Sequence, residues 1–143
     1  PVDAVSEPLF FDRTRYYEKE MGWPLHRRMI SFKNLAPPDR LVEVKIRTNE
    51  LEQRSLAEGK REVNMDPGYV CAERLVLATG KNYVHRIYLR KGIYADLTLV
   101  YRKGTFHALE WTYPDYRQPE LIRFFNETRT VYMEQLRERR RID

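Results

Sequence analysis

Polar side chains able to take part in acid–base chemistry occur at predicted turns and strand ends in the middle of the chain. They are Asn64, Asp66, Lys81, His85, Arg86 and Asp115. A carboxylate, a lysine and a histidine that meet can exchange protons with a substrate or bind phosphate. The catalytic candidates are Asp66, Lys81, His85 and Asp115. A structural role is the alternative, because Asp66 precedes Pro67-Gly68 and can cap its own turn, and Asp115 can cap the approach to the last helix.

A second set of residues combines arginine with aromatic rings on one predicted sheet face. The two-residue alternation of strands places these side chains opposite Ile87, Leu89, Leu97 and Leu99. The set is Arg86, Tyr88, Arg90, Tyr94, Thr98, Arg102 and Phe106. Single-stranded nucleic acids bind such sheets, because bases stack on rings and phosphates pair with cations. The ligand-binding candidates are Arg86, Tyr88, Arg90, Tyr94 and Arg102. The alternative is that the C-terminal helix covers this face and packs against the tyrosines.

Residue spacing predicts neither a metal site nor a nucleophilic enzyme. The three histidines, His26, His85 and His107, are far apart in the sequence, and no Cys-x-x-Cys or His-x-x-x-His pattern occurs. Cys71 lies in an apolar run, where a thiol is usually inert, and there is no Gly-x-Ser-x-Gly motif. We therefore expect no metal and no cofactor.

Length and composition indicate one globular domain over residues 1–143, since 42% of the residues are hydrophobic and 33% are charged. The single cysteine excludes a disulfide within the chain and fits a cytoplasmic location. No apolar run approaches the length of a membrane span, so we expect no membrane partner. The net charge of +5 favours an anionic partner, a nucleic acid or nucleotide, and leaves the oligomeric state open. The first eleven residues resemble domain interior, which predicts that the natural protein begins earlier.

Three runs rich in β-forming residues predict an antiparallel meander over about 84–113. The runs are 84–90, 93–101 and 105–113. They are joined at Lys91-Gly92 and Lys103-Gly104, where glycine supplies the positive φ that a tight hairpin needs. Short strands at 9–11 and 28–32 and a brief helix at 15–21 are expected ahead of the meander. Residues 70–78 suit a strand or a buried helical turn equally well.

The last part of the chain predicts a long helix over about 118–138. Its apolar stripe is Leu121, Phe125, Thr128, Tyr132 and Leu136. Residues 40–57 are ambiguous at their start, because apolar and charged residues alternate over 42–47 as in a strand, but the length of the segment and its second half favour a helix. The predicted fold class is α+β, an antiparallel sheet packed by helices. The residues expected to be largely buried are Leu121, Phe125, Tyr132, Ile87, Leu97 and Leu99.

Seven sequence blocks occur in an order that resembles one bacterial family. Two of them read Val63-Asn64-Met65-Asp66-Pro67-Gly68-Tyr69 and Trp111-Thr112-Tyr113-Pro114-Asp115-Tyr116, and the others are 16–22, 48–52, 77–81, 85–89 and 92–95. Over nearly its whole length the chain is similar to the family described as domain of unknown function 4416. The resemblance implies an additional N-terminal segment. Some members are labelled as GTP-binding, but this sequence has no Gly-x-x-x-x-Gly-Lys-Ser/Thr loop.

Three functions are compatible with these patterns. The first is a binding module for an anionic ligand, single-stranded nucleic acid or nucleotide, on the basic and aromatic sheet face. The second is a small enzyme that acts on a phosphorylated or carboxylated metabolite through the Asp/Lys/His cluster. The third is a structural or partner-binding subunit. Because the sequence contains no recognisable catalytic spacing, it favours the binding module.

Overall fold

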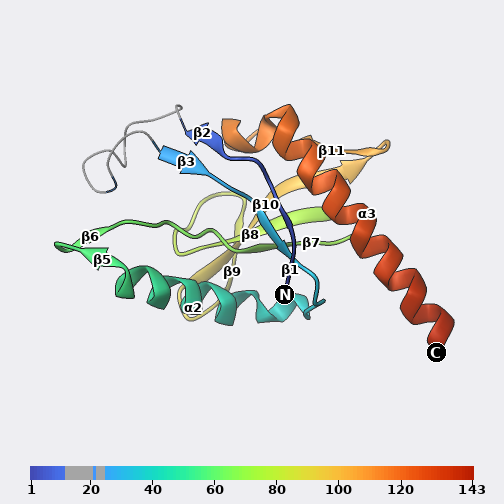
Figure 1. Ribbon diagram of the computed structural model, residues 1–143, viewed down its shortest axis with the longest axis horizontal. Coiled ribbons are helices and arrows are strands. Elements are labelled where there is room, and N and C mark those ends of the chain that lie inside the picture. The colour runs from blue at the N-terminus through green and yellow to red at the C-terminus, as the bar shows by residue number, and fades with distance from the viewer. Residues whose placement is uncertain (12–20, 22–24) are drawn as a thin grey trace.

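A five-stranded antiparallel sheet lies at the centre of the computed structural model, which describes residues 1–11, 21 and 25–143 (Figure 1). Helix α2 (Leu41–Arg54) packs on one face of the sheet and helix α3 (Pro119–Ile142) on the other. The strands of the sheet are β7 (Gly68–Val70), β8 (Arg74–Thr79), β9 (Arg86–Arg90), β10 (Ile93–Arg102) and β11 (Thr105–Ala108). The fold is therefore α+β with a long C-terminal helix, as the sequence predicts.

Both predicted hairpins are present. Lys91-Gly92 joins β9 to β10 and Lys103-Gly104 joins β10 to β11. All four turn residues have positive φ, between 51° and 84°, which matches the right-handed twist of the strands on either side. The two glycines reach this conformation without steric cost.

Strands β9 and β11 lie along the same edge of β10, at opposite ends of that strand. Tyr94 is paired with both β8 and β9, and Leu99 is paired with both β8 and β11. A strand has two edges, so β8 occupies one edge of β10 and the two hairpin partners share the other. Residues 70–78, for which the sequence allowed strand or helix, contain the end of β7 and most of β8.

A β-bulge in the middle of β10 reverses which face its side chains point to. The register with β8 shifts between Leu97 and Leu99. Before the bulge, Ile93 and Ala95 pack with α2. After it, Leu99 and Tyr101 pack with α3. One extra residue moves the following side chains to the other face, so a single strand contributes to both cores.

Helix α2 begins after one turn of 3₁₀ helix, η1 (Pro38–Arg40), whose fixed proline φ suits a helix start. Leu41 and Val42 pack against Val76, Ala78 and Ile93 of the sheet. The helix predicted over 40–57 is confirmed over Leu41–Arg54, and residues 56 and 57 form a short strand instead.

Two buried charged residues of α2 fix the segment that leads into β7. Lys45 donates from Nζ to the carbonyl of Met65 at 3.2 Å. Glu52 accepts the backbone N–H of Met65 at 2.6 Å and lies 3.5 Å from Nη1 of Arg61. The polar side of α2 is therefore tied to residues 61–66 by hydrogen bonds as well as by ion pairs.

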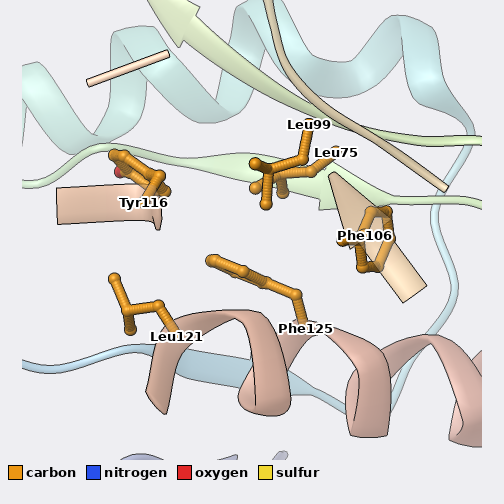
Figure 2. Close-up of a cluster of buried hydrophobic side chains, with 6 residues drawn as sticks. All are labelled: Leu75, Leu99, Phe106, Tyr116, Leu121 and Phe125. Atoms are coloured by element: carbon orange, nitrogen blue, oxygen red, sulfur yellow. The ribbon is translucent and has the colours of Figure 1, made fainter. Parts of the chain in front are cut away.

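The second core lies between the sheet and α3 (Figure 2). Leu121 and Phe125 point from α3 toward Leu75 and Leu99 of the sheet, with Phe106 toward one end of the group and Tyr116 toward the other. Tyr116 belongs to a second 3₁₀ turn, η2 (Pro114–Arg117), immediately before α3.

Three two-stranded ribbons complete the described structure. They are β1 (Val2–Val5) with β4 (Ile30–Phe32), β2 (Leu9–Phe11) with β3 (Leu25–Arg27), and β5 (Leu56–Ala57) with β6 (Lys60–Arg61). The strand predicted at 9–11 is present, and the one predicted at 28–32 is confined to Ile30–Phe32. The helix predicted at 15–21 lies outside the described residues except for Met21. In the described part of the chain, neither helix is apolar enough over sufficient length to cross a bilayer.

The burial predictions hold for three of six residues. Leu99, Leu121 and Phe125 are buried, whereas Leu97 and Tyr132 are half-buried. Ile87 is 70% exposed, so the prediction that it is buried is wrong. It lies on the edge strand β9, where strand alternation gives the direction of a side chain but not whether a helix covers it.

Replacing Phe125 with alanine should lower the free energy of unfolding by about 3–5 kcal/mol, because the ring fills the centre of the α3 core. Urea denaturation followed by circular dichroism measures the change. Val131→Ala, at an exposed position of the same helix, is the matched control and should cost less than about 1 kcal/mol. An equally small loss for Phe125→Ala would contradict the packing shown in Figure 2.

Candidate functional site

The edge of β10 has a gap that side chains fill. Pairing with β9 ends at Asp96 and pairing with β11 begins at Leu99, and in the described part of the chain no strand pairs with this edge between them. Trp111 donates from Nε1 to the carbonyl of Leu97 at 2.7 Å. Thr112 donates from Oγ1 to the carbonyl of Thr98 at 2.6 Å. The strand predicted over 105–113 therefore ends at Ala108, because the chain must turn to bring these two side chains to the gap.

Arg117 and Thr112 hold the turn in place. The guanidinium of Arg117 donates to the carbonyls of Leu109 and Thr112 at 2.6 and 3.0 Å. Thr112 also accepts the N–H of Leu109 at 2.8 Å. These bonds fix the indole of Trp111 relative to the sheet.

A hollow of about 330 Å³ lies next to the indole. We call it the Trp111 pocket; it is lined by Tyr83, His85, Arg86, Trp111 and Tyr113. The imidazole of His85 stacks on the indole, with ring centroids 4.9 Å apart and planes 13° apart, and Tyr83 meets the imidazole edge-on at 5.8 Å. Tyr83, Trp111 and Tyr113 are exposed, so aromatic surface surrounds the opening.

The carboxylate of Asp96 organises the polar groups of the pocket. Its Oδ2 accepts from Nε of Arg86 at 2.8 Å and lies 3.1 Å from Nε2 of His85. Its Oδ1 lies 3.3 Å from the hydroxyl of Thr98. Burial lowers the pKa of Arg86, but the hydrogen bonds with Asp96 and Tyr113 raise it by more, so the net pKa is raised and the guanidinium stays charged. The Arg86–Asp96 pair is therefore neutral as a unit.

The side chain of His85 is only 6% exposed, and its Nδ1 is buried with no hydrogen-bond partner among the described residues. When Nε2 carries the proton that faces Asp96, a neutral imidazole has an unprotonated Nδ1. A carboxylate that orients a histidine in this way is a component of many acid–base sites. The pocket thus combines aromatic surface, guanidinium N–H donors and an oriented imidazole.

The structure brings two of the four catalytic candidates to the pocket. His85 lines it, and the carbonyl of Lys81 accepts from Nη1 of Arg86 at 3.1 Å, which places Lys81 beside it. Asp66 lies 3.1 Å from the amide of Asn64 and 3.9 Å from Nζ of Lys45. Asp115 forms an ion pair with Arg27 at 3.2 Å. Both aspartates are thus engaged in ion pairs of their own.

Three of the five ligand-binding candidates share one face. Arg86 is paired with Asp96 across the strands, and Tyr88 with Tyr94, whose rings are 5.3 Å apart. Arg90 lies on the other face, because a register shift pairs it with Ile93, whose side chain faces α2. Its guanidinium forms an ion pair with Glu43 of α2 at 2.6 Å.

Arg102 also leaves the predicted face, because it follows the bulge in β10, which reverses the alternation. Phe106 stays on the face of Arg86 and Tyr88, but it is paired with Tyr101 and buried against α3. Arg102 is exposed and follows Tyr101, which packs on the α3 side, so Arg102 points away from that face. The prediction that all seven side chains share a face is therefore wrong, and two register shifts are the reason.

Sequence reasoning did not identify Asp96, Tyr83, Trp111 or Tyr113 as site residues. One signal for Asp96 is available in the sequence, since it is the only acidic residue in the apolar run 93–101. Trp111 and Tyr113 belong to the sequence block 111–116, but no pattern in this block predicts that it turns back onto β10.

A second hollow, of about 360 Å³, lies where α2 begins. Its lining includes Leu41, Val42, Tyr69 and Ala95. Two charged residues, Asp39 and Arg90, also line this hollow, and Arg90 is paired with Glu43. The residues that line it include none of the catalytic candidates. In the described part of the chain, no three His, Cys, Asp or Glu side chains are grouped closely enough to hold a metal ion.

The family described as Domain of unknown function (DUF4416) matches residues 1–132 of the chain. No curated protein and no solved structure matches the chain.

The buried phenol of Tyr116 gives a pH prediction for the α3 core. Burial raises its pKa; Arg27 lowers it, and Asp66, Asp115 and Asp96 raise it further. Unfolded tyrosine ionises near pH 10. The phenol therefore loses its proton more easily in the unfolded chain, and its contribution to stability is complete below about pH 10 and is lost as the pH rises above that value.

We expect the free energy of unfolding to fall above about pH 10 by up to 1.4 kcal/mol per pH unit from this one group. Tyr116→Phe should remove that part of the slope, as measured by urea denaturation at several alkaline pH values. Tyr83→Phe, at an exposed ring, is the control and should keep the slope of the parent chain. Identical slopes for the parent and Tyr116→Phe would contradict the assignment.

Proposed function

Since the chain belongs to the domain of unknown function 4416 family, whose description names no activity, we propose its function from the Trp111 pocket. The chain is a binding module for an anionic ligand that carries a nucleobase, either a nucleotide or a single-stranded nucleic acid. The observation that supports this proposal is the ring of exposed aromatic side chains around a guanidinium group.

The aromatic rings suit a planar, uncharged ring system. Tyr83, Trp111 and Tyr113 surround an opening whose inner wall is the stacked imidazole of His85. Every nucleobase has a π face, and stacking one on an aromatic side chain stabilises binding by about 1–3 kcal/mol. A site of this kind binds bases with little dependence on their sequence.

The polar groups suit a phosphate beside the base. A guanidinium has five N–H donors, and the partners of Arg86 are Asp96, the carbonyl of Lys81 and Tyr113, which leaves donors for a ligand. Because Asp96 compensates the charge of Arg86, the long-range attraction comes from Lys81 and from the net charge of +5. Binding should therefore weaken as salt rises.

Fluorescence anisotropy with a fluorescein-labelled single-stranded oligonucleotide tests the proposal. Tyr113→Ala should weaken binding by about 1–3 kcal/mol through lost stacking, and its exposed position, at 61%, means that folding is little affected. Lys81→Gln should reduce the dependence of affinity on salt.

Phe32→Ala is the matched control for this test. It removes a ring that is 67% exposed on the β1–β4 ribbon and does not line the pocket, so the affinity should equal that of the parent. No change in anisotropy at micromolar protein and low salt would exclude the nucleic-acid ligand. An equal loss for Phe32→Ala and Tyr113→Ala would show that binding does not occur at the pocket.

The contact between His85 and Asp96 supports a second candidate, an enzyme that acts on a phosphorylated metabolite. A histidine oriented by a carboxylate can serve as a general base. If a bound nucleotide is hydrolysed, phosphate release should disappear in His85→Phe, which keeps a ring next to Trp111, while binding persists. If the chain is only a binding module, neither the parent nor His85→Phe should release phosphate.

A further inference from the structure

We propose that the ligand is a single-stranded nucleic acid of at least two nucleotides, because a second stacking position lies beside the Trp111 pocket. Tyr88 and Tyr94 form this position, which we call the tyrosine pair. The inference rests on the proposed function and narrows it, since a mononucleotide would occupy the pocket alone.

The strand register places the tyrosine pair next to the pocket on the same face of the sheet. Arg86, which lines the pocket, is paired with Asp96, and the next pair on this face is Tyr88 with Tyr94. The two tyrosine rings meet edge to face with centroids 5.3 Å apart. The backbone N–H of Gly92 donates to the hydroxyl of Tyr88, with 3.4 Å between nitrogen and oxygen. This bond fixes the hydroxyl end of the ring, and the strand backbone fixes the other end.

The tyrosine pair is accessible because the α3 core covers a different part of this face. Leu99, Leu75 and Phe106 form the buried cluster with α3, and all three lie at the end of the sheet beyond the bulge. Tyr94 precedes the bulge, and Tyr88 is 57% exposed on the edge strand. An aromatic ring with this exposure can receive the face of a base.

The spacing favours two successive bases over one. Residues two apart in a strand are separated by about 7 Å, so Tyr88 lies about this far from Arg86 along β9. This is about twice the 3.4 Å that separates nucleotides along one strand of a duplex. Two bases at these positions are therefore unstacked from each other, which is possible in an extended single strand and not in a duplex.

Exposed lysines lie at both ends of the line from the pocket to the tyrosine pair. Lys81 is beside the pocket, and Lys91 is in the turn that follows β9, adjacent to Gly92. A mononucleotide would use one of these cations. A strand that passes both stacking positions places phosphates near each of them, which gives the second lysine a partner.

Competition binding to the full chain tests the inference. The probe is a fluorescein-labelled tetranucleotide, and the competitors are unlabelled mono-, di- and tetranucleotides in DNA and RNA form. In at least one of the two series, the affinity should rise at least about fivefold from the mononucleotide to the longer competitors, the lower limit for one added stacked base. Tyr88→Ala should abolish this rise and leave the affinity for the mononucleotide unchanged.

Ile87→Ala is the matched control, because Ile87 neighbours Tyr88 on the same strand, is 70% exposed and points to the opposite face. Ile87→Ala should keep the rise in affinity with the length of the competitor. A tetranucleotide with a single base and abasic sugars at the other positions carries the same phosphates and should lose at least about fivefold in affinity if stacking is the cause.

The outcomes separate this inference from the proposed function. A mononucleotide that competes as well as the tetranucleotide overturns the second stacking position and leaves the proposed function intact. A duplex that competes as well as the single strand also overturns it, because paired bases cannot reach the rings. If the affinity of Tyr88→Ala still rises with the length of the competitor, the second stacking position is overturned as well. Failure of the labelled tetranucleotide and of labelled mononucleotides to bind at all overturns both proposals.

Discussion

The structure depends on how the backbone carbonyl groups of β10 find hydrogen-bond donors at the bulge. Residues 97 and 98 are not paired with β9 or β11, and a buried carbonyl without a donor costs about 1–3 kcal/mol. Trp111 and Thr112 supply the donors, and the turn that carries them is held by Arg117. This requirement ends β11 early, directs the chain toward η2 and places the indole against His85. The candidate site is thus built on a solution to a main-chain hydrogen-bonding problem.

The same bulge lets one strand serve two hydrophobic cores. Without it, Leu99 would face α2 together with Ile93, and α3 would lack a central contact in the sheet. With it, Asp96 and Leu99 lie on the α3 side, one in the polar site and the other in the apolar core. The boundary between site and core is therefore set by a shift of one residue in register.

The sequence predicts the parts of this fold that depend on local interactions. The glycines at 92 and 104 determine two hairpins, and the proline start and apolar stripe determine α2 and α3, because turn and helix preferences act over a few residues. The grouping of Arg86, Tyr88 and Tyr94 follows from alternation within regular pairing. The positions of Arg90, Arg102 and Trp111 could not be predicted, because a bulge depends on what the neighbouring strands offer, and alternation no longer applies beyond it.

The bonds between α2 and the segment before β7 have a consequence for hydrogen exchange. The amide of Met65 lies outside regular secondary structure, yet it donates to the buried carboxylate of Glu52, and the carbonyl of the same residue accepts from the buried ammonium of Lys45. Exchange of an amide with solvent requires its hydrogen bond to open. Opening at Met65 requires α2 to separate from this segment and leave two charges without their partners. This isolated amide should therefore exchange with deuterium as slowly as those of α2 and report when the helix lifts from the sheet.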